Sequence, residues 1–254
     1  MNRLEGKAIL VAGGGGIGAE LARRYAQEGA RVVLGDLDLE GARAVAEDIA
    51  RSGGRARAVR LDGADEDSVA AAVALACEIH GGLDGLHANF ATFVDGSFDA
   101  GVVELPLAAY DETMRVNARG YLLCTRYALP AIIARGGGSI VYTSSLAADA
   151  GEPCRVAYAM SKAAVHALMR HVAARYGPDG VRANCIAPGV TLHDRVKSAL
   201  GPDFMEWALG IAHIKSRTGR PDDIAAMGAL LLSDEGSFIT GQVVSIDGGA
   251  TMRP

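Results

Sequence analysis

A tyrosine and a lysine stand four residues apart in the segment Tyr158-Ala159-Met160-Ser161-Lys162. On a helix, positions i and i+4 are neighbours on one face, so the phenol and the ammonium group would lie together. A free tyrosine titrates at about 10, too high for a general base at neutral pH, but a nearby cation stabilises the phenolate and lowers that pKa. The pair predicts a tyrosine that exchanges protons with a substrate. The spacing alone also fits a half-exposed tyrosine beside a surface lysine, so the prediction depends on the surrounding residues.

Two other polar residues are placed to join this pair. Ser145 follows the apolar segment 139–143, and its hydroxyl can donate to a substrate oxygen as negative charge develops there. Asn117 lies in the helix-like run Met114-Arg115-Val116-Asn117. Asparagine is unfavourable inside a helix, so this position indicates a functional role or a kink.

A glycine cluster covering residues 13–18 follows a predicted strand and opens a predicted helix. A pyrophosphate must approach backbone N–H groups and the positive end of a helix, and a Cβ atom would block that approach. In this context the cluster is typical of a dinucleotide-binding turn, and an ordinary strand–helix turn is the alternative.

Asp36 ends the second predicted strand, 18 residues after Gly18. A carboxylate at this place binds the ribose hydroxyls of NAD and would repel the 2′-phosphate of NADP. Neither Gly15 nor Leu37 supplies a cation for that phosphate. The sequence therefore favours NAD(H), with a solvated strand end as the alternative reading of Asp36.

The elements that must position these residues alternate along the chain. Apolar runs predict strands, helical spacing predicts the segments between them, and the alternation predicts parallel βαβ units. We expect an α/β fold with a doubly wound parallel sheet (a Rossmann fold), and a single domain over residues 1–254. The expected strands are 8–12, 31–34, 56–61, 85–89, 139–143, 182–186 and 243–246; the expected helices are 17–28, 39–52, 67–79, two helices or one broken run over 107–135, 158–176 and 221–232.

This order of motifs resembles the short-chain dehydrogenase/reductase family over almost the whole chain. The family's Asn–Ser–Tyr–Lys tetrad matches Asn117, Ser145, Tyr158 and Lys162. The resemblance implies that Tyr158 donates or accepts the proton, and that Lys162 lowers its pKa and bonds the nicotinamide ribose. It also implies that Ser145 positions the substrate oxygen and that Asn117 helps to hold a water in a proton relay.

The resemblance implies further contacts with the cofactor. Asp62 matches the family's adenine-contacting Asp, Asn89 matches the second Asn of its NNAG motif, and a Pro-Gly pair after the sixth strand borders the nicotinamide; the ending 246–249 is also family-like. The complete set of expected cofactor-binding residues is Gly13, Gly15, Gly16, Ile17, Gly18, Asp36, Asp62, Gly63, Asn89, Tyr158, Lys162, Pro188, Gly189 and Thr191.

The glycine turn departs from the family pattern TGxxxGxG. Aligned on Gly16 and Gly18, the pattern places its Thr and first Gly on Val11 and Ala12. Either Ala12 replaces that glycine or the turn is one residue shorter. The glycines at 13, 15 and 18 also fit the GxGxxG spacing of other Rossmann folds.

Two other departures lie near the expected nicotinamide. The family's NNAG site ends here in Phe90 and Ala91, which are bulky enough to displace the cofactor or to reshape the substrate side. His193 stands where the family often has a Thr that contacts the carboxamide, with Thr191 two residues earlier.

Residues 189–219 are expected to cover the substrate, since loops after strand ends carry specificity. Phe204 and Trp207 could form a hydrophobic lid or anchor their helix on the body of the protein. Arg195 and Lys197, next to Asp194, could meet an acidic substrate or be solvated surface charges.

Composition and missing motifs disfavour several other classes of protein. The formal net charge of −5 disfavours a non-specific nucleic-acid binder. The four cysteines lack CxxC spacing and the histidines lack HxH or HExxH spacing, which predicts reduced thiols and no metal site. There is no GxSxG and no GxxxxGK[ST], which disfavours a nucleophile-elbow hydrolase and a P-loop nucleotidase. Without a membrane-length apolar run or a signal peptide, a cytoplasmic location and no membrane partner are expected.

We therefore expect an enzyme that moves a hydride between NAD(H) and a small-molecule alcohol or ketone, with Tyr158 as general acid/base. The family resemblance implies a homotetramer, or less often a dimer. The alternatives are an NAD-binding sensor without turnover, and an epimerase or lyase on the same fold, which the Phe90-Ala91 site leaves open. The sequence does not name the substrate, because substrate contacts lie on loops without a transferable code.

Overall fold

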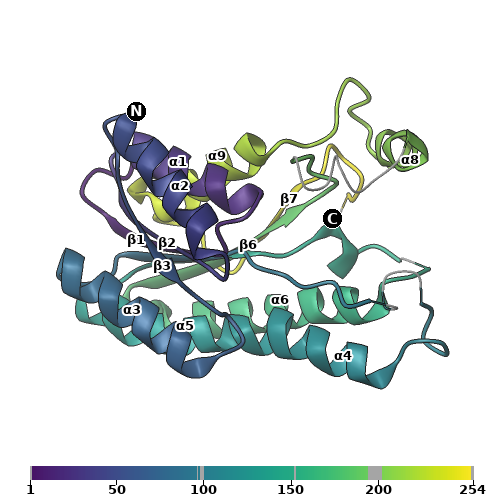
Figure 1. Ribbon diagram of the computed structural model, residues 1–254, viewed down its shortest axis with the longest axis horizontal. Helices are drawn as coiled ribbons and strands as arrows, with labels where there is room; N and C mark the ends of the chain where they lie inside the picture. The colour runs from purple at the N-terminus through teal and green to yellow at the C-terminus, as the bar shows by residue number, and fades with distance from the viewer. Residues whose placement is uncertain (1, 96, 98–99, 152, 194–201, 253–254) are drawn as a thin grey trace.

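Seven parallel strands form one sheet in the computed structural model, which describes residues 2–95, 97, 100–151, 153–193 and 202–252 (Figure 1). The strand order is β3-β2-β1-β4-β5-β6-β7. The chain leaves β1 toward one edge of the sheet and returns to build the other half from β4 onward. This reversal makes a topological switch point between β1 and β4, where open α/β sheets bind their ligands. The strands are β1 Ala8–Ala12, β2 Arg31–Asp36, β3 Arg55–Arg60, β4 Gly85–Ala88, β5 Gly138–Thr143, β6 Val181–Pro188 and β7 Val243–Ile246.

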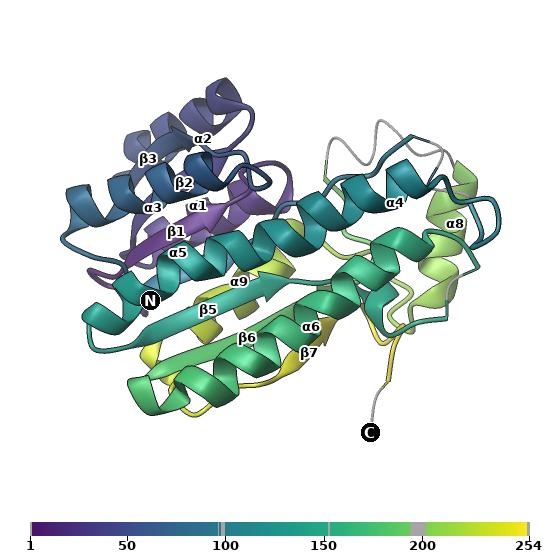
Figure 2. The same ribbon diagram turned by 90° about the horizontal axis from the view of Figure 1, so that it is seen from below.

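Helices cover both faces of the sheet (Figures 1 and 2). One face carries α1 (Ile17–Gln27), α2 (Leu39–Arg51) and α9 (Pro221–Leu232), and the opposite face carries α3 (Glu66–His80), α4 (Leu107–Met114), α5 (Gly120–Ala134) and α6 (Val156–Tyr176). Helix α8 (Pro202–Ile211) stands beyond the carboxyl ends of the strands. Short 3₁₀ turns η2 (Leu146–Ala148), η3 (Gly177–Asp179) and η4 (Asp234–Gly236) connect these elements.

The strand alternation divides the core into two halves. Ile9 and Val11 of β1 pack into the cluster under α1 and α9, whereas Leu10 and Ala12 pack into the cluster under α3, α5 and α6. All five residues of β1 are buried, as a continuous apolar run in a two-sided parallel sheet requires. The doubly wound α/β architecture expected from the sequence is confirmed.

The run 107–135 is one helical stretch with an irregular centre. Residues Arg115–Arg119 form a π-helical turn (η1) between α4 and α5, in which the Gly120 N–H donates to the Arg115 carbonyl. Single π turns inside helices frequently occur at functional sites. The irregularity that Asn117 suggested in the sequence is therefore present, and Asn117 lies in the middle of the π turn.

No helix in the described part of the chain is both long enough and apolar enough to cross a membrane. The same residues contain no cluster of three or more His, Cys, Asp or Glu side chains arranged to hold a metal ion.

Candidate active site

The expected site residues gather along one edge of the sheet, where the parallel strands end. The glycine turn follows β1, Asp36 ends β2, Asp62 and Gly63 follow β3, Asn89 follows β4, Ser145 follows β5, and Pro188, Gly189 and Thr191 lie at the end of β6. The register explains this alignment, since Ala12 at the end of β1 lies opposite Gly35 on β2 and Ala88 on β4.

The glycine turn begins at Gly13. Ala12 still belongs to β1, and the Gly13 N–H donates to the Gly35 carbonyl at 2.7 Å. Gly13 has a φ of 101°, and a Cβ atom on it would lie 2.8 Å from the Phe90 nitrogen. A Cβ at Gly18 would overlap the carbonyl oxygen of Gly13. Ala12 therefore does not replace a turn glycine, and the turn is the shorter of the two alternatives.

Asp36 braces this turn. Its Oδ2 accepts hydrogen bonds from the Gly14 N–H at 2.6 Å and the Gly15 N–H at 3.1 Å. The next residue, Gly16, is the N-cap of α1 with a φ of 50° and no side-chain cap. The first N–H groups of a helix have no intrahelical partner, so this end of α1 has the donor set that binds a phosphate group.

His193 packs against the same turn. A Cβ atom on Gly16 would lie 2.8 Å from each of three atoms of the His193 ring. The imidazole that replaces the family's usual Thr therefore reaches the glycine turn. Nearby, the Thr191 hydroxyl donates to the Gly189 carbonyl at 3.2 Å, and Thr191 pairs with Gly219 in an isolated bridge.

A directed chain of buried and partly buried hydrogen bonds links the core to the glycine turn. Burial lowers the pKa of His87 to about 3, so its ring is neutral. The Thr143 hydroxyl donates to Asn89 Oδ1 at 2.8 Å and must therefore accept from His87 Nε2–H at 2.9 Å. His87 Nδ1 is then an acceptor, and the Tyr25 hydroxyl donates to it at 2.6 Å. Asn89 Nδ2 completes the chain by donating to the Gly13 carbonyl at 3.2 Å.

Lys162 is fully buried beneath the catalytic candidates. Its Nζ donates to the Thr143 carbonyl at 2.9 Å and to the Tyr121 hydroxyl at 3.1 Å, and lies 5.8 Å from the centre of the Tyr158 ring. Burial lowers the pKa of this amine from 10.5 to about 7. The structure thus brings the predicted tyrosine and lysine together on α6.

Ser145 is held next to α6 by its neighbour. The Ser144 hydroxyl and His166 Nε2 form a buried hydrogen bond of 2.7 Å between the end of β5 and α6. Ser145 itself caps η2, where its Oγ accepts from the Ala147 N–H at 3.2 Å. Through this bond His166 holds the end of β5, which precedes Ser145, against the helix that carries Tyr158 and Lys162.

Asn117 is buried, and its side chain binds the segment that follows β4. Its Oδ1 accepts from the Thr92 N–H at 2.7 Å, and its Nδ2 donates to the Thr92 carbonyl at 3.1 Å. This pair of bonds joins the π turn to the loop after Asn89. Both atoms of the side-chain amide are thereby engaged with the main chain of Thr92.

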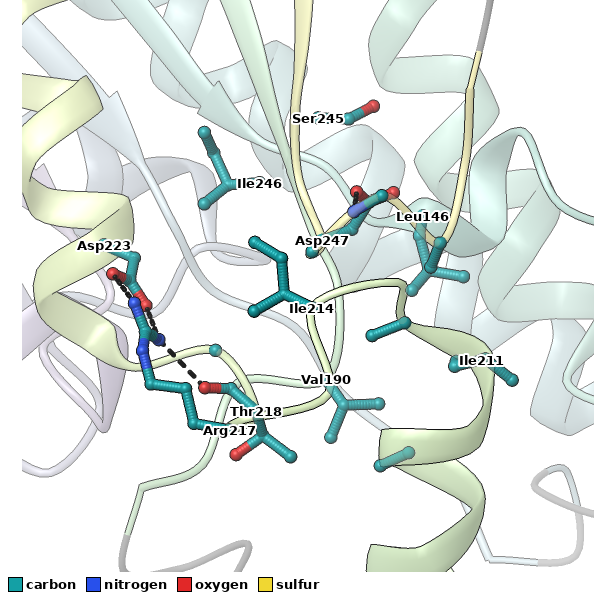
Figure 3. A pocket seen from close by; sticks show the side chains of 16 residues that line it. Leu146, Val190, Ile211, Ile214, Arg217, Thr218, Asp223, Ser245, Ile246 and Asp247 are labelled. Atoms are coloured by element: carbon teal, nitrogen blue, oxygen red, sulfur yellow. Dashed lines mark hydrogen bonds and ion pairs between the residues drawn. The ribbon is translucent and has the colours of Figure 1, made fainter.

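A pocket of about 300 Å³ is lined by α8, β7 and the segments that follow β5 and β6 (Figure 3). Leu146 and Val190, each one residue beyond an expected site residue, contribute to its wall. Ile211 and Ile214 line it from the α8 side, and the Arg217–Asp223 ion pair of 2.6 Å closes one end. Neither Tyr158 nor Lys162 lines this pocket, so the reacting groups lie beside it and not within it.

Comparisons with known proteins decide the family. A family model described as enoyl-(acyl carrier protein) reductase matches residues 11–251. A probable short-chain type dehydrogenase/reductase of Bradyrhizobium diazoefficiens is 45% identical over 98% of this chain and 89% of that protein. The chain belongs to the short-chain dehydrogenase/reductase family.

Other members of the short-chain dehydrogenase/reductase family are similar over their whole length. A 2,5-dichloro-2,5-cyclohexadiene-1,4-diol dehydrogenase of Sphingobium indicum is 38% identical over 99% of both chains. A solved 7α-hydroxysteroid dehydrogenase, complexed with NADH and 7-oxo glycochenodeoxycholic acid, superposes with a TM-score of 0.92 at 32% identity and covers 99% of this chain and 97% of its own. The protein is thus an oxidoreductase of this family with a Rossmann fold.

The bulky Phe90 ring fits into this site because two neighbouring residues are glycines. Its ring occupies a slot between Gly63 and Gly120, where a Cβ on either glycine would collide with it. The ring also packs edge-on against Tyr121, with 4.9 Å between centroids. These contacts accommodate the bulk of the Phe90 ring within the protein.

Two aromatic residues near the tetrad were not expected from the sequence. Tyr121 lies one helical turn after Asn117, a spacing that could have indicated it, and its hydroxyl contacts Lys162. Phe93 is half-exposed and stacks on Tyr158 with ring centroids 4.7 Å apart. No local pattern marks Phe93, because it lies in an irregular loop.

The expected substrate-covering segment is only partly within the described residues. Trp207 is exposed on α8, as a lid residue or a surface residue would be. The residues Asp194, Arg195 and Lys197 and the side chain of Phe204 lie outside the described part of the chain.

Proposed function

We propose that this short-chain dehydrogenase/reductase is an NAD(H)-dependent enzyme that interconverts a secondary alcohol and a ketone, with Tyr158 as general acid/base. The observation that carries the proposal is the buried Lys162 ammonium, held 5.8 Å from the Tyr158 ring at the carboxyl edge of the sheet. A protein that only binds a nucleotide would have no need to bury an amine beneath a tyrosine.

The residues at the switch point fit a dinucleotide. The glycine turn and the uncapped start of α1 would hold the diphosphate, and Asp36 would bind the adenosine ribose with Asp62 beside the adenine. Lys162 would bond the nicotinamide ribose, and the segment 188–191 would border the nicotinamide. When bound, NAD supplies the hydride acceptor and NADH the hydride donor.

The choice of NAD over NADP rests on Asp36. Its carboxylate is held against the glycine turn by two N–H donors, which supports negative charge beside the ribose site that we propose. A 2′-phosphate there would be repelled at short range. Arg31, at the other end of β2, donates to the Gly6 carbonyl and is directed away from this edge.

The proton transfer follows from the arrangement of the tetrad. In oxidation Tyr158 takes the proton of the substrate hydroxyl, and in reduction it returns a proton to the carbonyl oxygen. Lys162 stabilises the phenolate by its charge, and Ser145 donates a hydrogen bond to the substrate oxygen. Asn117 braces the loop through Thr92, and its turn would help to hold a water in the proton relay.

The substrate class we propose is a secondary alcohol carried on an aliphatic ring. Phe93, half-exposed and stacked on Tyr158, provides an apolar face beside the reacting group. The two named relatives described above act on a cyclohexadiene diol and on a steroid, respectively, as their names state. A flat apolar ring bearing a hydroxyl group matches an aromatic face beside a proton-transferring phenol.

We also propose that the chain assembles into a homotetramer. Leu107, Leu122 and Met160 are exposed apolar side chains on α4, α5 and α6. Helices α4 and α5 form one continuous helical stretch, and α6 lies alongside it (Figure 2). Such exposed side chains on adjoining helices favour packing against a second copy. Light scattering coupled to size exclusion tests this, and a monomer would contradict it.

The test of function is a pair of measurements on the purified protein. Fluorescence titration with NADH and with NADPH should show tighter binding of NADH, and a panel of cyclic secondary alcohols with NAD⁺ should yield NADH. Tyr158→Phe should lower turnover by about 10²–10⁴-fold, while the glycine turn and Asp36 still allow NADH to bind. Tyr127→Phe is the matched control, because its hydroxyl bonds Glu66 away from the site. Preference for NADPH, or full turnover in Tyr158→Phe, would refute the proposal.

A further inference from the structure

The Tyr121 hydroxyl is hydrogen-bonded to the buried amine of Lys162. It is fully buried on the first turn of α5, directly after the π turn. Its oxygen lies 3.1 Å from Lys162 Nζ, and Nζ stands 4.7 Å from the centre of its ring. The same amine is farther from the Tyr158 ring, at 5.8 Å.

The donor and acceptor roles in this contact are determined by chemistry. A lysine ammonium group can only donate, so the Tyr121 oxygen accepts its hydrogen bond. The phenol proton must then go to a carbonyl, and two are in reach, at 2.9 Å on Phe90 and 3.0 Å on Thr143. Burial raises the pKa of Tyr121 well above 10, so the phenol keeps this proton and stays neutral.

A neutral phenol suits a buried cation in two ways. Its oxygen replaces one of the water molecules that Lys162 loses on burial, and its ring face attracts the positive charge. A second hydrogen bond of the amine goes to the Thr143 carbonyl at 2.9 Å. The orientation of the phenol is also fixed, because the carbonyls of Phe90 and Thr143 bind its hydroxyl and the Phe90 ring packs against its ring.

We propose that Tyr121 is a positioning residue for the reaction, which holds the Lys162 ammonium group in its charged form beneath Tyr158. The inference deepens the proposed function and rests on it, because it gives the lysine of the tetrad a dedicated partner. Tyr121 does not touch the reacting atoms, and it acts through Lys162 alone.

The other titratable groups that face this amine are few in the described chain. Tyr158 lies on the same helix, and Tyr121 faces it from α5. Cys185, on β6, interacts with Lys162 electrostatically and raises its pKa, a smaller effect than the lowering by burial. Cys124 on α5 interacts with Tyr121, and burial raises the pKa of this thiol to about 12, so it stays neutral. Removal of the Tyr121 hydroxyl should therefore change the pKa of Lys162.

The experiment follows the titration of Lys162 directly by NMR. The chain has four lysines, Lys7, Lys162, Lys197 and Lys215, so protein grown with lysine labelled with ¹³C at Cε gives four signals. The Lys162→Met variant assigns the buried one. Tyr121→Phe should shift the titration midpoint of Lys162 down by about one pH unit, because a buried cation loses a hydrogen-bond acceptor.

Tyr142→Phe is the matched control. Tyr142 is equally buried and stacks on Tyr121 with centroids 6.1 Å apart, but its hydroxyl bonds Thr125 and does not contact Lys162. This variant should leave the Lys162 midpoint unchanged. An unchanged midpoint in Tyr121→Phe, or equal shifts in both variants, would overturn the proposal.

A measurement on the unmodified protein keeps the proposal testable if Tyr121→Phe does not fold. The amine lies over the Tyr121 ring, so the Cε protons of Lys162 should show an upfield ring-current shift and a nuclear Overhauser effect to that ring. Absence of both would overturn the proposal.

Turnover provides the functional readout. With an active alcohol, Tyr121→Phe should move the acid limb of the kcat profile to higher pH and lower kcat about tenfold on that limb, with KM unchanged. Because the NMR titration needs neither cofactor nor substrate, a wild-type protein without alcohol oxidation would refute the proposed function and leave the Tyr121–Lys162 result to be judged separately. Altered KM with unaltered kcat would contradict the positioning role.

Discussion

Replacing Lys162 with Met should stabilise the protein while it abolishes turnover. The native state lowers the pKa of Lys162 from 10.5 to about 7, a difference of about 3.5 pH units. Each unit corresponds to about 1.4 kcal/mol, so keeping this lysine costs about 5 kcal/mol of unfolding free energy below pH 7. A methionine of similar length fills the same space without this penalty.

The pH dependence separates this effect from a change in packing. Between about pH 7 and pH 10.5, the unfolded lysine stays protonated while the native one loses its proton, so the unfolded state binds more protons and the wild type gains stability as the pH rises. The advantage of Lys162→Met should therefore fall by about 1.4 kcal/mol per pH unit, to about 2 kcal/mol at pH 9.

Urea unfolding at a series of pH values measures both proteins. The cysteines and tyrosines titrate in both proteins, so their contributions drop out of the difference in unfolding free energy between variant and wild type. Lys215→Met is the control, because Lys215 is exposed and donates only to the carbonyls of Leu209 and Gly210. A difference for Lys162→Met that is flat with pH would refute the reasoning, as would a destabilised variant at pH 7.

Three further substitutions test the cofactor end and the core. Asp36→Arg should reverse the preference from NADH to NADPH in fluorescence titrations, because a cation replaces the carboxylate beside the glycine turn; unchanged preference would contradict the assignment. Gly18→Ala should lower the unfolding free energy by about 3 kcal/mol, because its Cβ would overlap a main-chain oxygen, whereas Gly177→Ala meets no atom within 4 Å and should be neutral in the same assay. Tyr25→Phe should cost about 1–3 kcal/mol in urea unfolding, since it leaves the buried Nδ1 of His87 without its donor, and a neutral result would argue against the hydrogen-bonded chain.

Much of the fold could be predicted because the local patterns and the tertiary structure agree. The apolar run at Ala8–Ala12 is long enough for one strand and too short for a helix, and it forms β1 with the expected bounds. Pro221 begins α9 at the expected residue, since proline is suited to the first turn of a helix. Most differences lie at element ends, as at β2, which continues through Asp36 because pairing with β3 extends it.

The candidate site was predictable where one residue type is required by its chemistry. Asp36 and the glycines lie beside each other because parallel strands all end at the same edge. The packing of the Phe90 ring against Gly120 was not predictable, because the two residues come from different elements. The packing of His193 on Gly16 has the same origin, since the partners are far apart in sequence.

The sequence by itself therefore determined the order of strands and helices, the place of the glycine turn and the pairing of Tyr158 with Lys162, because each depends on residues within a few positions of one another. Only the tertiary structure decided the environment of that lysine. Its burial, its lowered pKa and its contact with Tyr121 require α5, α6 and the end of β5 to meet in space. Desolvation depends on what covers a group from every side, and no local pattern of residues contains that information.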